Sequence, residues 1–160
     1  MERRRTIHVT VNETEYEREV EVRKTLADFL REDLGLRGTH LGCEQAVCGA
    51  CTIMFNDVSA RSCTLYAVQA DGADILTVEG LAPAGGTLHP IQEAFRDHHG
   101  LQCGFCTPGF LMPTLELLVE KRGPSEEEIR EAISGNLCRC TGYQGIVDAI
   151  RAADETWERT

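Results

Sequence analysis

The sequence has 160 residues, of which 42% are hydrophobic, and it carries a formal net charge of −10. This length suits one ordinary domain or two small ones with modest cores. The excess of acidic over basic residues is the same in both halves, which argues against a basic face for nucleic acid or for an anionic membrane surface. The charged residues are therefore expected to be solvated.

The first residues, MERRRTIHVTVN, contain a basic cluster but no apolar segment of signal-peptide length. No uninterrupted apolar run approaches the roughly 18 residues of a membrane span, so a cytoplasmic location is expected. The sequence has eight cysteines in 160 residues. This share, about 5%, is below the roughly 8 to 10% typical of disulfide scaffolds, and a reducing cytosol keeps cysteines as thiols. Metal binding is thus their leading explanation.

The cysteines fall into two groups of four, separated by a long stretch without cysteine: Cys43, Cys48, Cys51 and Cys63, then Cys103, Cys106, Cys138 and Cys140. The intervening segment GLAPAGGTLHP (80–90) is rich in glycine and proline, as linkers between domains are. We predict two domains, residues 1–80 and 81–160.

In the first half, alternating apolar and polar residues predict a β-hairpin from strands near 7–11 and 16–22. A capping-box pattern at Thr25 and Asp28 precedes a helical pattern that ends at Gly35. Further short strands are expected at 52–55, 62–68 and 74–78. This half is therefore predicted to be α+β with a small mixed sheet.

The second half has four helical patterns, which pack most simply as a small helical bundle. Their predicted starts are His89-Pro90, Thr107-Pro108, Ser125 with Glu128, and a point near Gly145. Pro113 falls beyond the first turn of the second helix, where it should remove a backbone hydrogen bond and bend the helix.

The first cysteine group has the spacing Cys43-x4-Cys48-x2-Cys51, with Cys63 following after eleven residues. The first three match plant-type 2Fe-2S ligation. Gly42, Gly49 and Ala50 would let the loop wrap closely and aim backbone N–H groups at an anionic cluster. A closed zinc site is the alternative, but the spacing lacks the paired short knuckles usual for zinc.

The second group consists of Cys103-x2-Cys106 and Cys138-x-Cys140. A disulfide across one residue would be badly strained, so a shared metal centre is favoured. If the loops LQCGFCTPG and GNLCRCTGY lie side by side at adjoining helix ends, their four sulfurs can enclose another 2Fe-2S cluster. The helix starts that follow would add N–H donors and positive dipole ends.

Other chemistry is weakly represented in the sequence. Rieske ligation is disfavoured because suitable Cys-x-His-type boxes are absent, and no phosphate loop or Ser/His/Asp constellation is evident. The histidines are expected to be surface or capping residues: His8, His40, His89, His98 and His99. We expect no catalytic residue and no substrate chemistry on this chain.

With GCEQAVCGACT, QCGFCTPGF and SGNLCRCTGY in this order, the chain resembles the small iron-sulfur subunit of molybdenum hydroxylases from about residue 6 to about 155. This is the family of xanthine dehydrogenase, aldehyde oxidoreductase and carbon monoxide dehydrogenase. The resemblance implies a ferredoxin-like β-grasp domain followed by a small four-helix bundle domain, each with one 2Fe-2S cluster held by its four cysteines.

The resemblance also implies that Gln102 contacts the molybdopterin of a separate large subunit, and that Cys140 both ligates iron and touches this pterin. The cytosine dinucleotide form of the pterin is left open. Electrons would run from molybdenum through the helical-domain cluster and then the β-grasp cluster to FAD on a medium subunit, or to another acceptor. A dimer of heterotrimers is the expected assembly. Pro113 departs from the helix-compatible residue expected in this family, and Gln102 has an alternative role as a loop cap.

Two other functions remain open at this stage. The chain could be a free 2Fe-2S ferredoxin that serves many partners, or a zinc-stabilised interaction protein. The helical second half favours a subunit, because a simple ferredoxin has no use for it. The sequence of this chain does not determine the substrate, the final electron acceptor, the reduction potentials or the stoichiometry of the complex.

Overall fold

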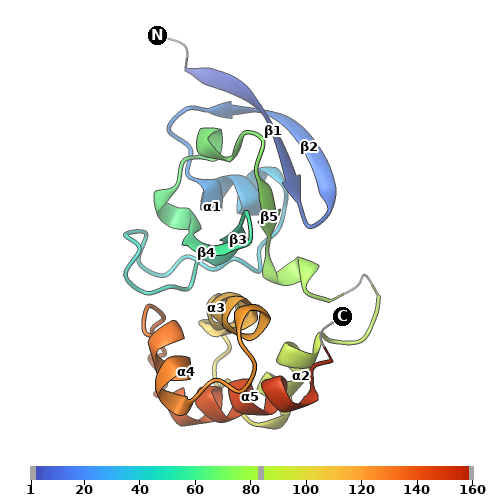
Figure 1. Ribbon diagram of the computed structural model, residues 1–160. Coiled ribbons are helices and arrows are strands. Elements are labelled where there is room, and N and C mark those ends of the chain that lie inside the picture. Colours follow the sequence, from blue (N-terminus) through green and yellow to red (C-terminus); the bar gives the residue numbers. More distant parts are fainter. Residues whose placement is uncertain (1–2, 83–84, 159–160) are drawn as a thin grey trace.

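The computed structural model describes residues 3–82 and 85–158. In this part of the chain, five strands form one sheet in the order β2-β1-β5-β3-β4. The sheet and α1 lie together, and the longer helices α2 to α5 pack against each other next to β3 and β4 (Figure 1). The described helices include none that is long and apolar enough to cross a membrane. The mixed α and β content confirms the coarse fold prediction.

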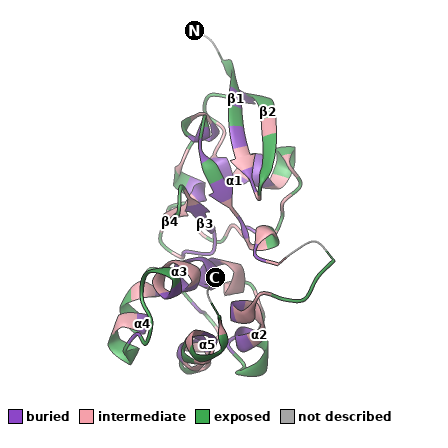
Figure 2. Ribbon diagram, turned by 45° about the vertical axis from the view of Figure 1, so that its right-hand side comes forward, coloured by how far each residue is buried: buried purple, intermediate pink, exposed green. Residues whose placement is uncertain are grey.

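The predicted N-terminal hairpin is confirmed. Strands β1 (Arg4–Val11) and β2 (Thr14–Glu21) pair antiparallel, with Val11 opposite Thr14. The turn residues Asn12 and Glu13 both have positive φ, 50° and 64°, as a tight turn that matches the strand twist requires. The inward side chains of β1 are buried, whereas β2 is mostly exposed (Figure 2).

The helix predicted after Thr25 is present but tightly wound only at its start. The Thr25 side chain accepts a hydrogen bond from the Asp28 N–H at 3.1 Å, and α1 (Leu26–Asp28) then widens into the π-helical segment η1 (Phe29–Asp33). Gly35 follows with φ of +73°, the left-handed conformation that commonly ends a helix.

The remaining strands were predicted only in part. Strands β3 (Thr52–Phe55) and β5 (Asp74–Leu76) lie where they were expected. The strand predicted at 62–68 is wrong, because this segment forms the 3-10 turns η2 (Ser62–Thr64) and η3 (Ala67–Ala70). Strand β4 (Val58–Arg61), which was not predicted, pairs with β3 at the edge of the sheet, where the segment 62–68 would otherwise have had to pair. A further 3-10 turn, η4 (Val78–Gly80), follows β5.

The helical second half follows the predicted caps. It comprises α2 (Pro90–Asp97), α3 (Thr107–Glu120), α4 (Glu126–Ala132) and α5 (Tyr143–Thr156). His89 caps α2 by accepting from the Ile91 N–H, which confirms its expected capping role. Pro113 lies inside α3 and is buried.

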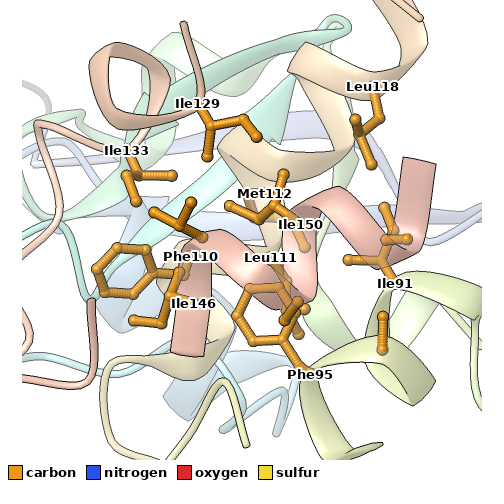
Figure 3. Close-up of a cluster of buried hydrophobic side chains, with 14 of the residues drawn as sticks. Ile91, Phe95, Phe110, Leu111, Met112, Leu118, Ile129, Ile133, Ile146 and Ile150 are labelled. Atoms are coloured by element: carbon orange, nitrogen blue, oxygen red, sulfur yellow. The ribbon is translucent and has the colours of Figure 1, made fainter. Parts of the chain in front are cut away.

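Each half has its own hydrophobic core. One cluster gathers the inward residues of β1, α1, η1, β3 and β5. The other is built from all four long helices, and Figure 3 shows side chains from each of them converging, including Phe95, Phe110 and Ile150. Met54 of β3 belongs to the helical cluster, so the two halves are in direct apolar contact.

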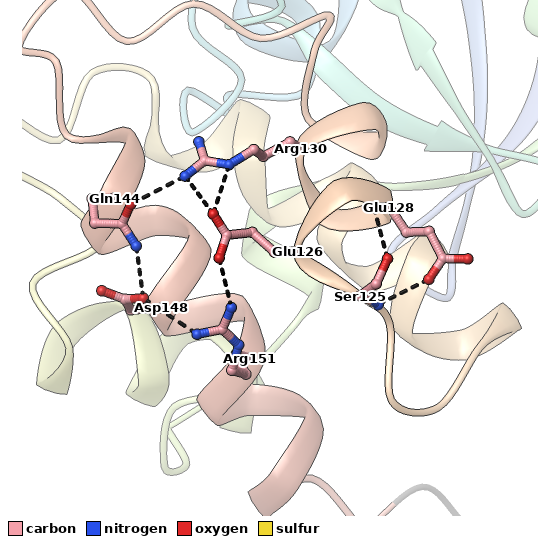
Figure 4. Close-up of polar contacts among 7 residues, drawn as sticks. All are labelled: Ser125, Glu126, Glu128, Arg130, Gln144, Asp148 and Arg151. Carbon is pink, nitrogen blue, oxygen red and sulfur yellow. Dashed lines mark hydrogen bonds and ion pairs between the residues drawn. The ribbon is translucent and has the colours of Figure 1, made fainter.

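Exposed polar contacts join α4 to α5. Glu126 accepts from Arg130 at 2.8 Å and from Arg151 at 3.0 Å, and Arg130 also reaches Gln144 (Figure 4). These pairs are about half exposed and each stabilises the fold by less than about 1 kcal/mol. The capping box at Ser125 and Glu128, also drawn in Figure 4, is the stronger local signal.

Replacing Ser125 with alanine removes the side-chain acceptor for the Glu128 N–H. We expect the free energy of unfolding to fall by about 1 kcal/mol, the usual cost of a lost N-cap. Urea unfolding followed by circular dichroism measures this change. Ser134→Ala, at an exposed serine just after α4, is the matched control, and an equal effect of both variants would contradict the capping role.

Replacing Gly109 with alanine would press α3 against the loop of the first half. A Cβ atom at this position would lie 2.3 Å from the Gly49 carbonyl oxygen and 3.0 Å from the Ala50 Cα. Because backbone must move to make room, we expect a loss of about 1 to 3 kcal/mol, seen as a lower midpoint of thermal unfolding. An unchanged midpoint would mean that the two halves are not held in this contact.

Candidate metal centres

The first set of thiols lies in one loop and the turn beside it. Cys43, Cys48 and Cys51 belong to the loop between η1 and β3, and Cys63 lies in η2. The N–H and the hydroxyl of Ser62 both donate to the Cys51 carbonyl, at 3.3 and 2.8 Å. These two bonds hold η2, and with it Cys63, beside Cys51.

The loop of the first set turns its backbone N–H groups toward sulfur. Glu44, Ala46 and Gly49 all have positive φ, 55°, 62° and 73°, and the Cys48 N–H donates to the Cys43 Sγ at 3.3 Å. Consecutive N–H groups arranged in this way form a concave site for an anion. A Cβ atom at Gly42 would lie 3.1 Å from the Cys48 Sγ, so this glycine permits the tight wrapping predicted for it.

The second set of thiols lies at two adjoining helix starts. Cys103 and Cys106 precede α3, and Cys138 and Cys140 precede α5. The Gly142 N–H donates to the Cys138 Sγ at 3.3 Å, which supplies a donor of the kind expected near a helix start. The structure therefore brings together the two short loops, whose nearer cysteines, Cys106 and Cys138, have 31 residues between them in the sequence.

Within each set, the thiols lie close enough to interact with one another. Side-chain contacts join Cys43 to Cys48 and Cys63 to Cys51, and in the second set Cys103 to Cys140 and Cys106 to Cys138. All eight cysteines are free of disulfides. Among residues 3–82 and 85–158, no three His, Cys, Asp or Glu side chains come close enough together to hold a single metal ion. Four neighbouring thiols per set match a 2Fe-2S cluster, in which each iron takes two protein ligands.

The protein environment divides the thiols into two classes. Backbone N–H groups of Gln45 and Cys48 lower the pKa of Cys43 to about 7, and the N–H of Phe105 lowers the pKa of Cys103. Burial raises the pKa of Cys63 to about 11 and that of Cys106 to about 12. Such raised pKa values keep a thiol protonated at neutral pH, and the thiol must lose this proton when it binds a metal.

The surroundings of the second set also fit a bound group. A cavity of about 380 Å³ is bordered by three of its thiols, by Cys48 of the first set, and by Phe105 and Leu137. Next to Cys106, the Thr107 hydroxyl is the one buried side-chain polar atom that lacks a hydrogen-bond partner within the described residues. Buried hydroxyls normally have an acceptor, and the sulfur atoms of a cluster would supply one. The donor set, four thiols with N–H groups, suits iron-sulfur ligation.

Gln102 is exposed beside this second set. Its amide nitrogen lies 3.6 Å from the position that a Cβ atom on Gly142 would occupy. Among the histidines that were expected at the surface, His8 is exposed. Its Nε2 lies 3.8 Å from the Glu17 Oε1.

Sequence reasoning missed several residues that join the two cysteine loops. His40 stacks on Phe105 with ring centroids 4.8 Å apart, and its Nδ1 lies 2.7 Å from the Phe105 carbonyl oxygen. Asn136 is 4% exposed and bonds to backbone of both halves. Phe105, between two predicted ligands, and Asn136, in the motif GNLC, were the available signals in the sequence.

Two family models together cover most of the chain. A model described as "2Fe-2S iron-sulfur cluster binding domain" matches residues 9–77, and one described as "[2Fe-2S] binding domain" matches residues 77–151. Both sets of cysteines fall inside these matches. The chain thus has two 2Fe-2S binding domains.

Individual relatives match over nearly their whole length. The chain is 55% identical to caffeine dehydrogenase subunit gamma of Pseudomonas sp. (strain CBB1), covering 95% of this chain and 92% of that one. It is 56% identical to the nicotine 6-hydroxylase small subunit of Paenarthrobacter nicotinovorans, covering 90% and 86%. A crystal structure of quinoline 2-oxidoreductase from Pseudomonas putida 86 superposes with a TM-score of 0.92, at 51% identity, over 96% of both chains. The chain therefore belongs to the small iron-sulfur subunits of the molybdenum hydroxylases, the electron-transfer components of the family that includes xanthine dehydrogenase and aldehyde oxidoreductase.

Proposed function

We propose that each set of four cysteines holds one 2Fe-2S cluster and that electrons pass through both clusters in turn. The observation that carries this assignment is the gathering of the eight thiols into two sets of four, each with a backbone N–H group directed at sulfur. Electrons would enter the second cluster from a molybdopterin on a partner subunit. They would leave the first cluster toward FAD or another acceptor.

The pterin contact is assigned to Gln102 and Cys140. Gln102 and the neighbouring Cys103 are exposed, and Cys140 is half-buried, so a cofactor on another subunit could approach this edge directly. Half-exposed apolar side chains surround the same edge, namely Leu101, Phe105 and Leu137. Such residues suit a surface that becomes buried by a partner.

The finer description of the fold belongs to the same proposal. We assign residues 1–80 to a ferredoxin-like β-grasp domain and residues 81–160 to a four-helix bundle domain. The separate hydrophobic cores support a boundary near residue 80, as does the meeting of the two family models at residue 77.

The proposed assembly is a heterotrimer with a large molybdopterin subunit and a medium FAD subunit, doubled and located in the cytoplasm. The relatives' descriptions as "subunit gamma" and "small subunit" support a multi-subunit complex. Native mass spectrometry of the complex from its host, with metal analysis, tests this assembly. A free ferredoxin would elute alone in every fraction, and a zinc protein would be colourless and contain no iron.

Replacing one ligand in each set tests the assignment of cysteines to clusters. We expect Cys51→Ser to abolish the first cluster and Cys106→Ser the second, because serine preserves the volume but is a poor ligand for this cluster. Each variant should retain half of the iron and sulfide and one of two EPR signals after reduction. Loss of both signals in either variant, or loss of neither, would contradict two separate sets.

Replacing Gln102 with alanine tests the pterin contact in the native complex. We expect a lower molybdenum-to-iron ratio in complex purified through a tag on this chain, because one polar contact to the pterin is lost. Gln69→Ala, at an exposed glutamine in the first half, is the control. If Gln102 acts only as a loop cap, the ratio will stay constant and the EPR signal of the second cluster will shift instead.

A further inference from the structure

Asn136 lies at the junction of the two halves with every polar group of its side chain engaged. Its amide nitrogen donates to the Gly49 carbonyl at 3.0 Å and to the Gly109 carbonyl at 2.7 Å. Its amide oxygen accepts from Arg61 at 3.2 Å. The residue is only 4% exposed, and buried polar groups that are fully bonded select one arrangement of the backbone around them.

The proline in α3 explains why the Gly109 carbonyl is available to Asn136. In a regular helix this carbonyl would accept from the N–H four residues later, which is position 113. Pro113 has no N–H, so the carbonyl lacks its helical donor. The Asn136 amide takes that position, and α3 is thereby bonded to the loop before Cys138.

Arg61 extends the same network from the end of β4. Its guanidinium donates to the Gly135 carbonyl at 2.7 Å and to the Asn136 amide oxygen in the second half, and to the Thr52 hydroxyl in the first. A planar group with several N–H donors can reach acceptors in both halves at once.

Close backbone packing leaves this network no room for adjustment. A Cβ atom at Gly49 would lie 2.5 Å from the Gly135 carbonyl oxygen, and one at Gly135 would lie 2.4 Å from the Arg61 guanidinium. The Leu137 N–H donates to the Cys48 carbonyl at 2.8 Å, so the backbone of one cysteine loop is bonded directly to that of the other.

Each member of the network lies close in sequence to a cysteine. Gly49 follows Cys48, and Thr52 follows Cys51; Arg61 is two residues before Cys63; Asn136 is two residues before Cys138. We propose that Arg61 and Asn136 are positioning residues that fix the two clusters relative to one another, so that the electron passes between them at a set separation and orientation. This inference rests on the proposed assignment of ligands.

The test uses the magnetic interaction between the two clusters in the native complex. When both clusters are reduced, each is paramagnetic, and the splitting of their EPR lines at low temperature depends on their separation and orientation. We expect Arg61→Met and Asn136→Ala each to reduce this splitting while the g values of both clusters stay unchanged. Arg61→Lys keeps the charge but loses the forked geometry, so its splitting should be intermediate.

Arg18→Met is the matched control, because Arg18 lies on the exposed strand β2, where its guanidinium bonds to the neighbouring Glu17 carbonyl and stacks on Tyr16. Its splitting should equal that of the wild type. The double variant Arg61→Met with Asn136→Ala should lose less than the sum of the single effects, since the two residues share one bond.

An unchanged splitting in both single variants, with both clusters present, would overturn the inference. If Arg61→Met fails to hold both clusters, the splitting in Arg61→Lys decides in the same way. Failure of the ligand assignment is a separate outcome, because it would appear in the Cys51→Ser and Cys106→Ser variants as the loss of both EPR signals or of neither.

Discussion

Direct contact between the backbone of the first cysteine loop and helix α3 constrains the rest of the structure. At Gly49 and Gly109 the two backbone segments approach so closely that neither position can carry a side chain. The contact joins a sheet half and a helical half that each have a separate core. Two small domains with modest cores would otherwise be free to move against one another, as domains with small polar interfaces commonly do.

The two cysteine sites solve the same electrostatic problem in local terms. The chain carries a net charge of −10, yet both sites must stabilise further negative charge on sulfur. Backbone N–H groups contribute to this through the positive φ of Glu44 and Ala46 in the first loop and through the Gly142 N–H at the second. Fixed dipoles of this kind need no reorganisation when an electron arrives.

What could be predicted from the sequence depended on how local the determining contacts were. The caps at Thr25, His89 and Ser125 use partners within three residues, so their helices were readable. Strand β4 has no strong strand pattern of its own and forms by pairing with β3, so it was not predicted. The apolar segment 62–68 has a strand-like pattern, but its backbone forms two 3-10 turns.

The grouping of the cysteines was readable from spacing alone, but the contacts that join the groups were not. The bonds of Asn136 to Gly109 and Gly49 span 27 and 87 residues, and no local pattern encodes such a separation. Pro113 was a further signal in the sequence. Its position inside α3 predicts a missing helical hydrogen bond. In the structure this leaves the Gly109 carbonyl free to accept from the Asn136 amide.

This arrangement limits how the protein can be recombined. Pro113, Asn136 and Arg61 form one set whose members lie in three separate segments, on both sides of the linker. A chimaera that joined the sheet half of one relative to the helical half of another at the linker would separate Arg61 from its acceptors unless both parents carried the same set. Compatibility at this junction, more than overall identity, should decide which halves can be exchanged during evolution or design.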